Sequence, residues 1–226
     1  GNNQQGPHES IFDGRPSLNN FQVKSWSKMH NYYDPADTRR AAELMVSVAD
    51  HYRGNNNFEY DLVDIVRQAL DDQARLQYLR TIADYNGFDR QAFSRDSARF
   101  LNMLLLQDSL LGTRREFRLG HWTEAARSLG QTPSEKDLYE WNARVQITTW
   151  GNRVCADEGG LCDYAHKEWQ GLLRDFYYPR WHTYFDALSK QMAHDTKPDL
   201  TALGEGANAN KTATELFAMA LPKGPV

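Results

Sequence analysis

One stretch decides the fold class, YDLVDIVRQALDDQARLQYLRTIADYN at residues 60–86. Its apolar side chains recur at helical spacing, which places Leu62, Ile65, Val66, Ala69, Leu76, Leu79 and Ala83 on one face. Asn86 and Gly87 follow as stop signals. The pattern predicts a long amphipathic helix, which is stable in water only when its apolar face packs against other elements.

The same period recurs on both sides of this stretch. One predicted face comprises Phe93, Ser97, Phe100, Leu101, Leu104, Asp108 and Leu111, widened by Leu105 and Leu106, and a later one comprises Leu138, Trp141, Val145 and Thr148. Further helices are predicted over residues 35–54, 90–112, 122–130, 132–151, 165–192 with a break or kink at Pro179, and 212–221. Asp34 before Pro35 and Thr132 before Pro133 are typical helix starts. The best strand candidate, residues 145–150, follows the second start and is interpreted as a helix end. We therefore predict an all-α fold: a helical bundle of about six to seven mostly antiparallel helices.

The first part of the chain differs from the rest. Residues 1–34 carry Gly and Pro breakers and no apolar period, so a long irregular N-terminal approach is expected there. Because a loop of this length needs support, it should lie against this domain or a neighbour. The predicted division is an approach over 1–34 and an α-helical domain over 35–226.

Composition excludes several classes of protein. The 226 residues include 26 basic and 30 acidic ones, a net charge of −4 that argues against a nucleic-acid partner. No apolar run has the length of a membrane span. Cys155 and Cys162 lack the spacing of a zinc site, and no metal or cofactor is expected. A local disulfide and two free thiols both remain open for this pair.

The sequence gives little evidence for catalytic residues. The chain has no G-x-S-x-G, P-loop, G-x-G-x-x-G or H-E-x-x-H motif. Asp71 and Asp72 are adjacent on a predicted helix and are interpreted as a solvated edge. Asp157 and Glu158 are interpreted as part of an exposed polar loop. The residues by themselves indicate only a soluble helical domain with an aromatic-rich end.

Five motifs in a fixed order add a family resemblance. They are YDLVDI with RQ at residues 60–68, LGHW at 119–122, LYEWNARVQITTWG at 138–151, DYAHK at 163–167, and GL…YPRW at 171–181. Together they resemble the C-terminal helical domain of the α-N-acetylglucosaminidases, glycoside hydrolases that remove terminal α-linked N-acetylglucosamine. His166 stands where the family has Asn, and the loop at 152–160 is longer than in the animal enzymes. The resemblance covers about residues 58–190, with a weaker likeness over 6–18.

The resemblance implies that the chemistry lies outside this chain. In the family, a small N-terminal domain and a (β/α)8-type barrel precede the helical domain, and the barrel carries the two carboxylates of a retaining mechanism. No catalytic residue is therefore expected in this chain, and the isolated fragment is expected to be inactive. The helical domain is expected to pack on the barrel mouth and to form one wall of the sugar pocket.

Four positions match the family's pocket residues: Trp150, Leu161, Tyr164 and, from a shorter match, His8. An indole or phenol ring can cover a sugar face, and hydroxyl or imidazole groups can bond sugar oxygens. The alternative for these residues is an ordinary role in the core or on the surface of the domain. Arg144, four residues after Glu140, and Arg180, directly after Pro179, are interpreted as structural.

The sequence thus predicts the C-terminal domain of an exo-acting α-N-acetylglucosaminidase. Its expected partners are the catalytic barrel of the same polypeptide and a glycan with terminal α-linked N-acetylglucosamine. The alternative is a non-catalytic helical interaction or glycan-binding module. With only one N-x-[ST] sequon, at Asn210, a bacterial periplasmic or secreted location is favoured over a lysosome.

Overall fold

The computed structural model describes residues 10–14, 16–18, 33–148, 150 and 165–194. This part of the chain forms six α-helices and, with only one isolated bridge between Arg118 and Gln170, no strand. The helices are α1 (Pro35–Ser47), α2 (Asn56–Asn86), α3 (Arg90–Leu111), α4 (Leu119–Ser128), α5 (Pro133–Ile147) and α7 (Tyr178–Ala193). Two short turns accompany them, the 3-10 turn η1 (Arg115–Phe117) and the π-helical turn η2 (Leu173–Tyr177). The all-α prediction is confirmed, whereas the helix predicted at 212–221 lies outside the described residues.

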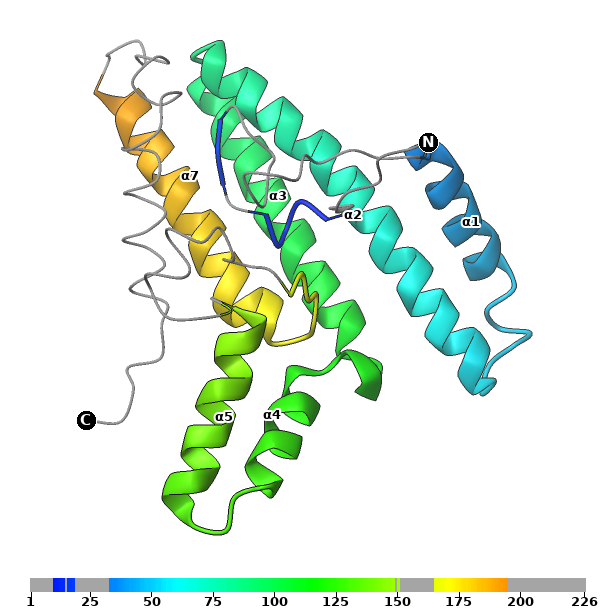
Figure 1. Ribbon diagram of the computed structural model, residues 1–226. Coiled ribbons are helices and arrows are strands. Elements are labelled where there is room, and N and C mark those ends of the chain that lie inside the picture. Colours follow the sequence, from blue (N-terminus) through cyan, green and yellow to red (C-terminus); the bar gives the residue numbers. More distant parts are fainter. Residues whose placement is uncertain (1–9, 15, 19–32, 149, 151–164, 195–226) are drawn as a thin grey trace, which may run out of the picture.

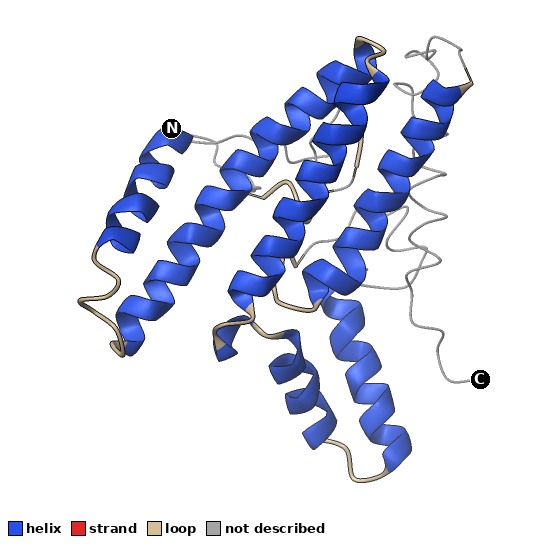
Figure 2. Ribbon diagram, turned by 180° about the vertical axis from the view of Figure 1, so that it is seen from behind, coloured by secondary structure: helices blue, strands red, loops and turns tan. Residues whose placement is uncertain are grey.

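The helices form one main layer with a hairpin at one end (Figure 1). In the layer α1 packs on α2, α2 on α3, and α3 on α7. Helices α4 and α5 pack on each other and project from the lower end of the layer, as the view from behind also shows (Figure 2). The described part of the N-terminal approach, drawn in dark blue, crosses the face of the layer.

Local signals place the helix starts. The Asp34 carboxylate accepts a hydrogen bond from the Ala36 amide at the start of α1. Thr132 and Glu135 form the reciprocal capping box of α5. The helix predicted to start at 165 begins only at Leu172 and continues through η2 into α7. The interruption predicted at Pro179 takes the form of the π-helical turn η2 directly before it, and the helix continues beyond the proline.

Aromatic side chains fill the centre of the layer. Tyr78 of α2, Phe100 of α3, and Trp181 and Phe185 of α7 have ring centroids 4.7–6.3 Å apart. Phe12, fully buried, adds a ring from the N-terminal approach at 5.3 Å from Phe100. The described start of the approach therefore belongs to the core of the helical layer, while the division at residue 34 stays a prediction.

Prediction of the buried faces succeeded for α3 and failed for α2. Phe93, Phe100, Leu104 and Leu111 of α3 are buried as predicted, but Leu106, which was predicted to widen this face, is 53% exposed. On α2, however, Leu76 and Leu79 are 42% and 43% exposed. The buried residues of α2 are instead Val63, Ala69, Asp71, Asp72, Ala74, Gln77, Tyr78, Thr81, Ile82 and Tyr85. Four of these are polar, so the apolar period alone indicated the wrong side.

The α4–α5 hairpin keeps much of its apolar surface exposed. Leu138 and Trp141 of the face predicted for α5 are 49% and 39% exposed, whereas Ala143 and Ile147 are buried. The indole N–H of Trp122 on α4 donates to the Ala143 carbonyl at 3.0 Å and joins the two helices.

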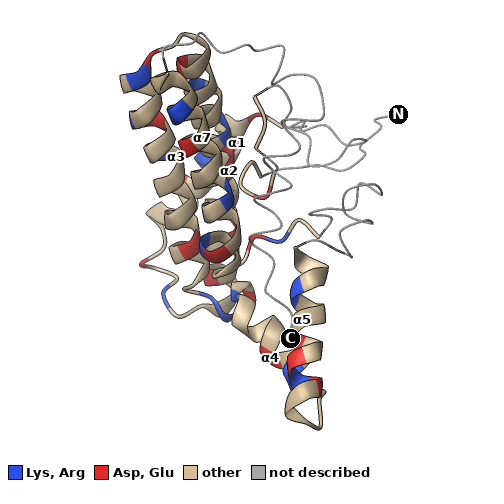
Figure 3. Ribbon diagram, turned by 90° about the vertical axis from the view of Figure 1, so that its left-hand side faces the viewer, with Lys and Arg blue, Asp and Glu red and all other residues tan. Residues whose placement is uncertain are grey.

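Acidic and basic residues are interspersed along the helices (Figure 3). Within the described residues, no helix combines the length and apolarity that a bilayer crossing requires.

Candidate functional site

Of the four predicted pocket residues, only Trp150 lies among the described residues; His8, Leu161 and Tyr164 lie outside them. Trp150 stands three residues beyond α5 and is 41% exposed, so it is not a core residue. Its φ of 65° lies in the left-handed region, and its amide donates to the Val145 carbonyl at 2.7 Å. An L-residue is held in this conformation only by its surroundings.

Helix α7 fixes the backbone of the N-terminal segment that follows His8 in sequence. The Arg180 guanidinium, 5% exposed, donates to the Asp13 carbonyl at 2.7 Å and to the Gly14 carbonyl at 3.0 Å. The Trp181 indole donates to the Phe12 carbonyl at 2.9 Å. Arg180 is thus structural, as predicted, and the Arg144–Glu140 pair of α5 is also present, at 2.6 Å.

The segment that follows Tyr164 in sequence lies against the same N-terminal residues. Residues 166–169 have no helical structure, and α-helix begins only after Gly171. The Ser10 hydroxyl lies within hydrogen-bond distance of a Glu168 carboxylate oxygen, and His166 Nδ1 lies 3.3 Å from Asp13 Oδ2. Residues separated by more than 150 positions are thereby brought together.

Glu168 belongs to a buried group of polar side chains that we call the carboxylate cluster. Its members are Ser10, Arg67, Asp71, Gln107 and Glu168. The Gln107 amide donates to Asp71 at 2.9 Å and to Glu168 at 3.1 Å. Arg67 Nη1 lies 2.7 Å from Glu168 Oε2 and 3.4 Å from Asp71 Oδ2, and its other nitrogens reach Asp64.

The electrostatics of this cluster depart from those of a surface. Burial and the neighbouring Glu168 charge raise the pKa of Asp71 well above its usual range, although Arg67 acts in the opposite direction. Burial alone would lower the pKa of Arg67, but the charges of Glu168, Asp71 and Asp64 outweigh it and raise that pKa. The interpretation of Asp71 and Asp72 as a solvated edge is wrong, because both are buried at 0% and 2% exposure. Asp72 also accepts a hydrogen bond from the Tyr33 hydroxyl at 3.0 Å.

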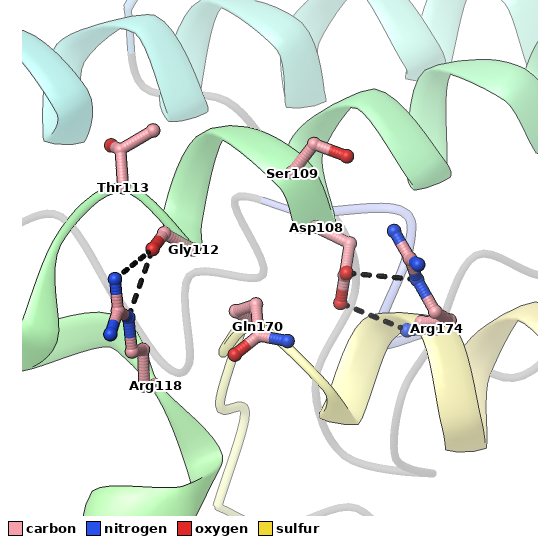
Figure 4. Close-up of a pocket in the computed structure, with 7 residues that line it drawn as sticks. All are labelled: Asp108, Ser109, Gly112, Thr113, Arg118, Gln170 and Arg174. Carbon is pink, nitrogen blue, oxygen red and sulfur yellow. Dashed lines mark hydrogen bonds and ion pairs between the residues drawn. The ribbon is translucent and has the colours of Figure 1, made fainter.

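A separate hollow of about 450 Å³ lies where the end of α3 meets the start of η2, and we call it the α3 hollow. It is lined by Asp108, Ser109, Gly112, Thr113, Arg118, Gln170 and Arg174 (Figure 4). Asp108 accepts from the Gly171 amide at 2.7 Å and pairs with Arg174 at 3.1 Å. Arg118 donates twice to the Gly112 carbonyl. Because these polar groups bind one another, they hold the end of α3 against the segment at 170–174. We therefore assign the hollow no ligand.

The described residues hold no group of three or more His, Cys, Asp or Glu side chains that could bind a metal ion. The strongest feature of the site is therefore how it positions two chain segments. The cluster, together with Arg180 and Trp181, joins two segments that each directly follow a predicted pocket residue. The family motifs supplied Arg67, Arg180 and Trp181, but Ser10, Asp71, Gln107 and Glu168 were not identified. No local pattern marks these four, since their partners are distant in sequence.

Fold and motifs together define a class, the C-terminal helical domains of α-N-acetylglucosaminidases. A family model described as the α-N-acetylglucosaminidase (NAGLU) C-terminal domain matches residues 1–219, and the chain belongs to this family. A human protein named α-N-acetylglucosaminidase is 32% identical over 190 residues, which cover 84% of this chain and 24% of that protein.

Solved structures agree with this membership. A family 89 glycoside hydrolase from Clostridium perfringens, bound to 2-acetamido-1,2-dideoxynojirimycin, matches with a TM-score of 0.85 and 32% identity over 97% of this chain and 24% of its own. A variant of the Clostridium perfringens enzyme in complex with its substrate GlcNAc-α-1,4-galactose matches with a TM-score of 0.84, 32% identity and the same coverage. The chain thus spans about a quarter of the length of these relatives.

Proposed function

We propose that this chain is the C-terminal helical part of an exo-acting α-N-acetylglucosaminidase and forms one wall of the terminal sugar pocket. In this proposal a barrel outside the chain carries the two carboxylates of a retaining hydrolysis, and no residue of residues 1–226 is catalytic. Support comes from family membership and from relatives whose names and bound ligands contain N-acetylglucosamine or its analogues.

One observation carries the pocket-wall role. Ser10 and Glu168 meet in the carboxylate cluster, and Asp13 and His166 pair beside it. His8 precedes Ser10 by two positions, and Tyr164 precedes His166 by two positions. Because the described residues next to these two positions in sequence are joined, we infer that both positions serve one pocket wall.

The proposed chemistry of this neighbourhood is recognition. The exposed indole of Trp150 offers a flat apolar face, which can cover a pyranose ring or an N-acetyl methyl group. In the proposal, Leu161 adds apolar contact while Tyr164 and His8 bond sugar oxygens. A site that pairs a hydroxyl or amide of the sugar rejects sugars that leave those groups unpaired.

Kinetics of the full-length polypeptide test the proposal. We expect Trp150→Ala and Tyr164→Phe each to lower kcat/KM on a chromogenic α-N-acetylglucosaminide more than about tenfold, or about 1.4 kcal/mol. Trp141→Ala and Tyr139→Phe are matched controls, because these rings are 39% and 37% exposed on α5 and should leave the kinetics unchanged. Equal effects of both pairs would contradict the assignment.

The isolated chain provides a second test. Residues 1–226 alone should show no turnover of the same substrate, and measurable turnover would place catalytic groups in this chain. Sugar binding by the isolated chain, with no hydrolysis by the full-length polypeptide, would favour a glycan-binding module instead. A bacterial periplasmic or secreted location is also proposed, supported by the single sequon at Asn210.

A further inference from the structure

The contacts of the carboxylate cluster require one more hydrogen than the cluster has when both of its carboxyl groups are ionised. The Ser10 Oγ atom lies 3.1 Å from Asp71 Oδ1 and also within hydrogen-bond distance of Glu168 Oε1. A serine hydroxyl has one hydrogen, so it can donate to only one of these oxygens. If both carboxylates were ionised, the other contact would set a lone pair of Ser10 against an anion.

A single added proton satisfies every one of these contacts. With Asp71 protonated on Oδ1, that group donates to Ser10 Oγ, and the Ser10 hydroxyl donates to Glu168. The second lone pair of Ser10 Oγ accepts from the Phe12 amide at 3.1 Å. The two amide hydrogens of Gln107 then serve Asp71 and Glu168, one each.

We propose that Asp71 and Glu168 share one proton and are positioning residues of the pocket wall, because the protonated pair holds Ser10 and so joins residues 10–14 to residues 165–171. The inference rests on the proposed function only for what this wall does. The joint itself is a property of the described residues.

The surrounding charges agree with a shared proton. Two buried carboxyl groups face one cation, Arg67, which also serves Asp64. Other charged groups on the packed elements have partners of their own: Asp108 pairs with Arg174, Asp13 with His166, Asp72 accepts from Tyr33, and Arg180 donates to the backbone of residues 13 and 14. One proton makes the carboxyl pair and Arg67 neutral as a group, which lowers the cost of burial.

The stability of the chain should therefore depend on pH in a defined direction. The pKa of Asp71 is raised in the folded state, so the folded chain binds a proton that the unfolded chain has released. The stabilisation is complete below the ordinary carboxyl pKa and is lost as pH rises through the raised value. Asp71→Asn keeps a donor toward Ser10 that does not titrate, although its NH2 group no longer accepts from the Gln107 amide, which costs stability equally at every pH.

The first experiment measures the melting temperature of the chain and of Asp71→Asn from about pH 5 to about pH 9. We expect the wild-type chain to lose stability relative to the variant as the pH rises. All other residues are the same in both proteins, so the difference between the two curves reports on position 71. Parallel curves over the whole range would overturn the shared proton.

A second experiment does not depend on Asp71→Asn folding well. Ser10→Ala removes the hydroxyl that joins both carboxyl groups and accepts from the Phe12 amide. Hydrogen exchange at residues 11–14 should accelerate at least about tenfold, while exchange in α3 stays unchanged. The control Ser128→Ala removes an exposed hydroxyl that bonds only its own helix, at the Ala125 carbonyl. Equal exchange in the two variants would overturn the joint.

Kinetics of the full-length polypeptide test the positioning role separately. Ser10→Ala should lower kcat/KM on a chromogenic α-N-acetylglucosaminide at least about threefold, chiefly through KM, because the binding wall moves and the catalytic acids do not. Faster exchange with unchanged kinetics would overturn the positioning role and retain the shared proton. An inactive unmodified polypeptide would overturn the proposed function, whereas the pH result would stand.

Discussion

Replacing Arg180 by methionine tests whether α7 anchors the N-terminal segment. Methionine keeps the apolar stem of the side chain but has no donor for the carbonyls of Asp13 and Gly14. Both carbonyls lie in a buried region, at 2.7 and 3.0 Å from the guanidinium. The guanidinium also lies over the Tyr177 ring, with 4.8 Å between its central carbon and the ring centroid.

The expected loss follows from these contacts. A hydrogen bond from a charged group contributes about 1.5–3 kcal/mol, and an unpaired buried acceptor retains its desolvation cost. Two such bonds give a loss of about 3–5 kcal/mol in the free energy of unfolding. Most domains of this size have about 5–15 kcal/mol, so the variant should fold and remain measurable.

Urea unfolding at 25 °C measures this loss by linear extrapolation. The matched control is Arg127→Met, which removes ion pairs to Asp137 and Glu140 from a side chain that is 39% exposed. Exposed pairs contribute about 0–1 kcal/mol, so the control should lose at most that. An Arg180→Met variant no less stable than the control would refute the anchoring of residues 13 and 14 by α7.

Three further substitutions, one of them with a matched control, test core packing, helix capping and backbone conformation, each by urea unfolding. Phe100→Ala should cost about 3–5 kcal/mol, because a fully buried ring is lost, whereas Leu106→Ala, at a 53% exposed position, should cost under about 1 kcal/mol. Thr132→Ala removes the capping box of α5 and should cost about 1 kcal/mol. Gly171→Ala should cost about 1–2 kcal/mol, since its φ of 90° disfavours alanine while Leu119 leaves room for the methyl group.

Sequence reasoning predicted the helices well wherever the signal was local. The capping box at Thr132 and the proline after Asp34 depend on residues within one turn, and both were correct. The buried face of α3 was also predicted, because its apolar residues occur on the side that contacts α2 and α7. The buried side of α2 was not, since it contains Asp71, Asp72, Gln77 and Thr81, and hydropathy assigns such residues to solvent.

The residues of the site also fall into those that a local pattern identified and those that it did not. Arg180 and Trp181 were found within a motif, although a motif does not say that they bind the backbone of residues 12–14. The pairing of Ser10 with Glu168 spans 158 positions and involves residue types that are common on surfaces. Only a three-dimensional arrangement shows that these groups share a buried space. Periodicity predicts where a helix is apolar, but not which buried polar groups will find partners.

Under the proposed function, this arrangement links the interior of the helical layer to the pocket wall. Neither residues 10–14 nor residues 166–169 form regular secondary structure, so their own backbone pairing does not hold them. Their positions are set by side chains of α2, α3 and α7, through Arg67, Gln107 and Arg180. Such a segment moves when its buried partners change, because an unpaired buried polar group costs about 1–3 kcal/mol and the chain adjusts to avoid that cost. In the proposed enzyme, the interior of the helical layer and the shape of the sugar pocket are therefore energetically coupled.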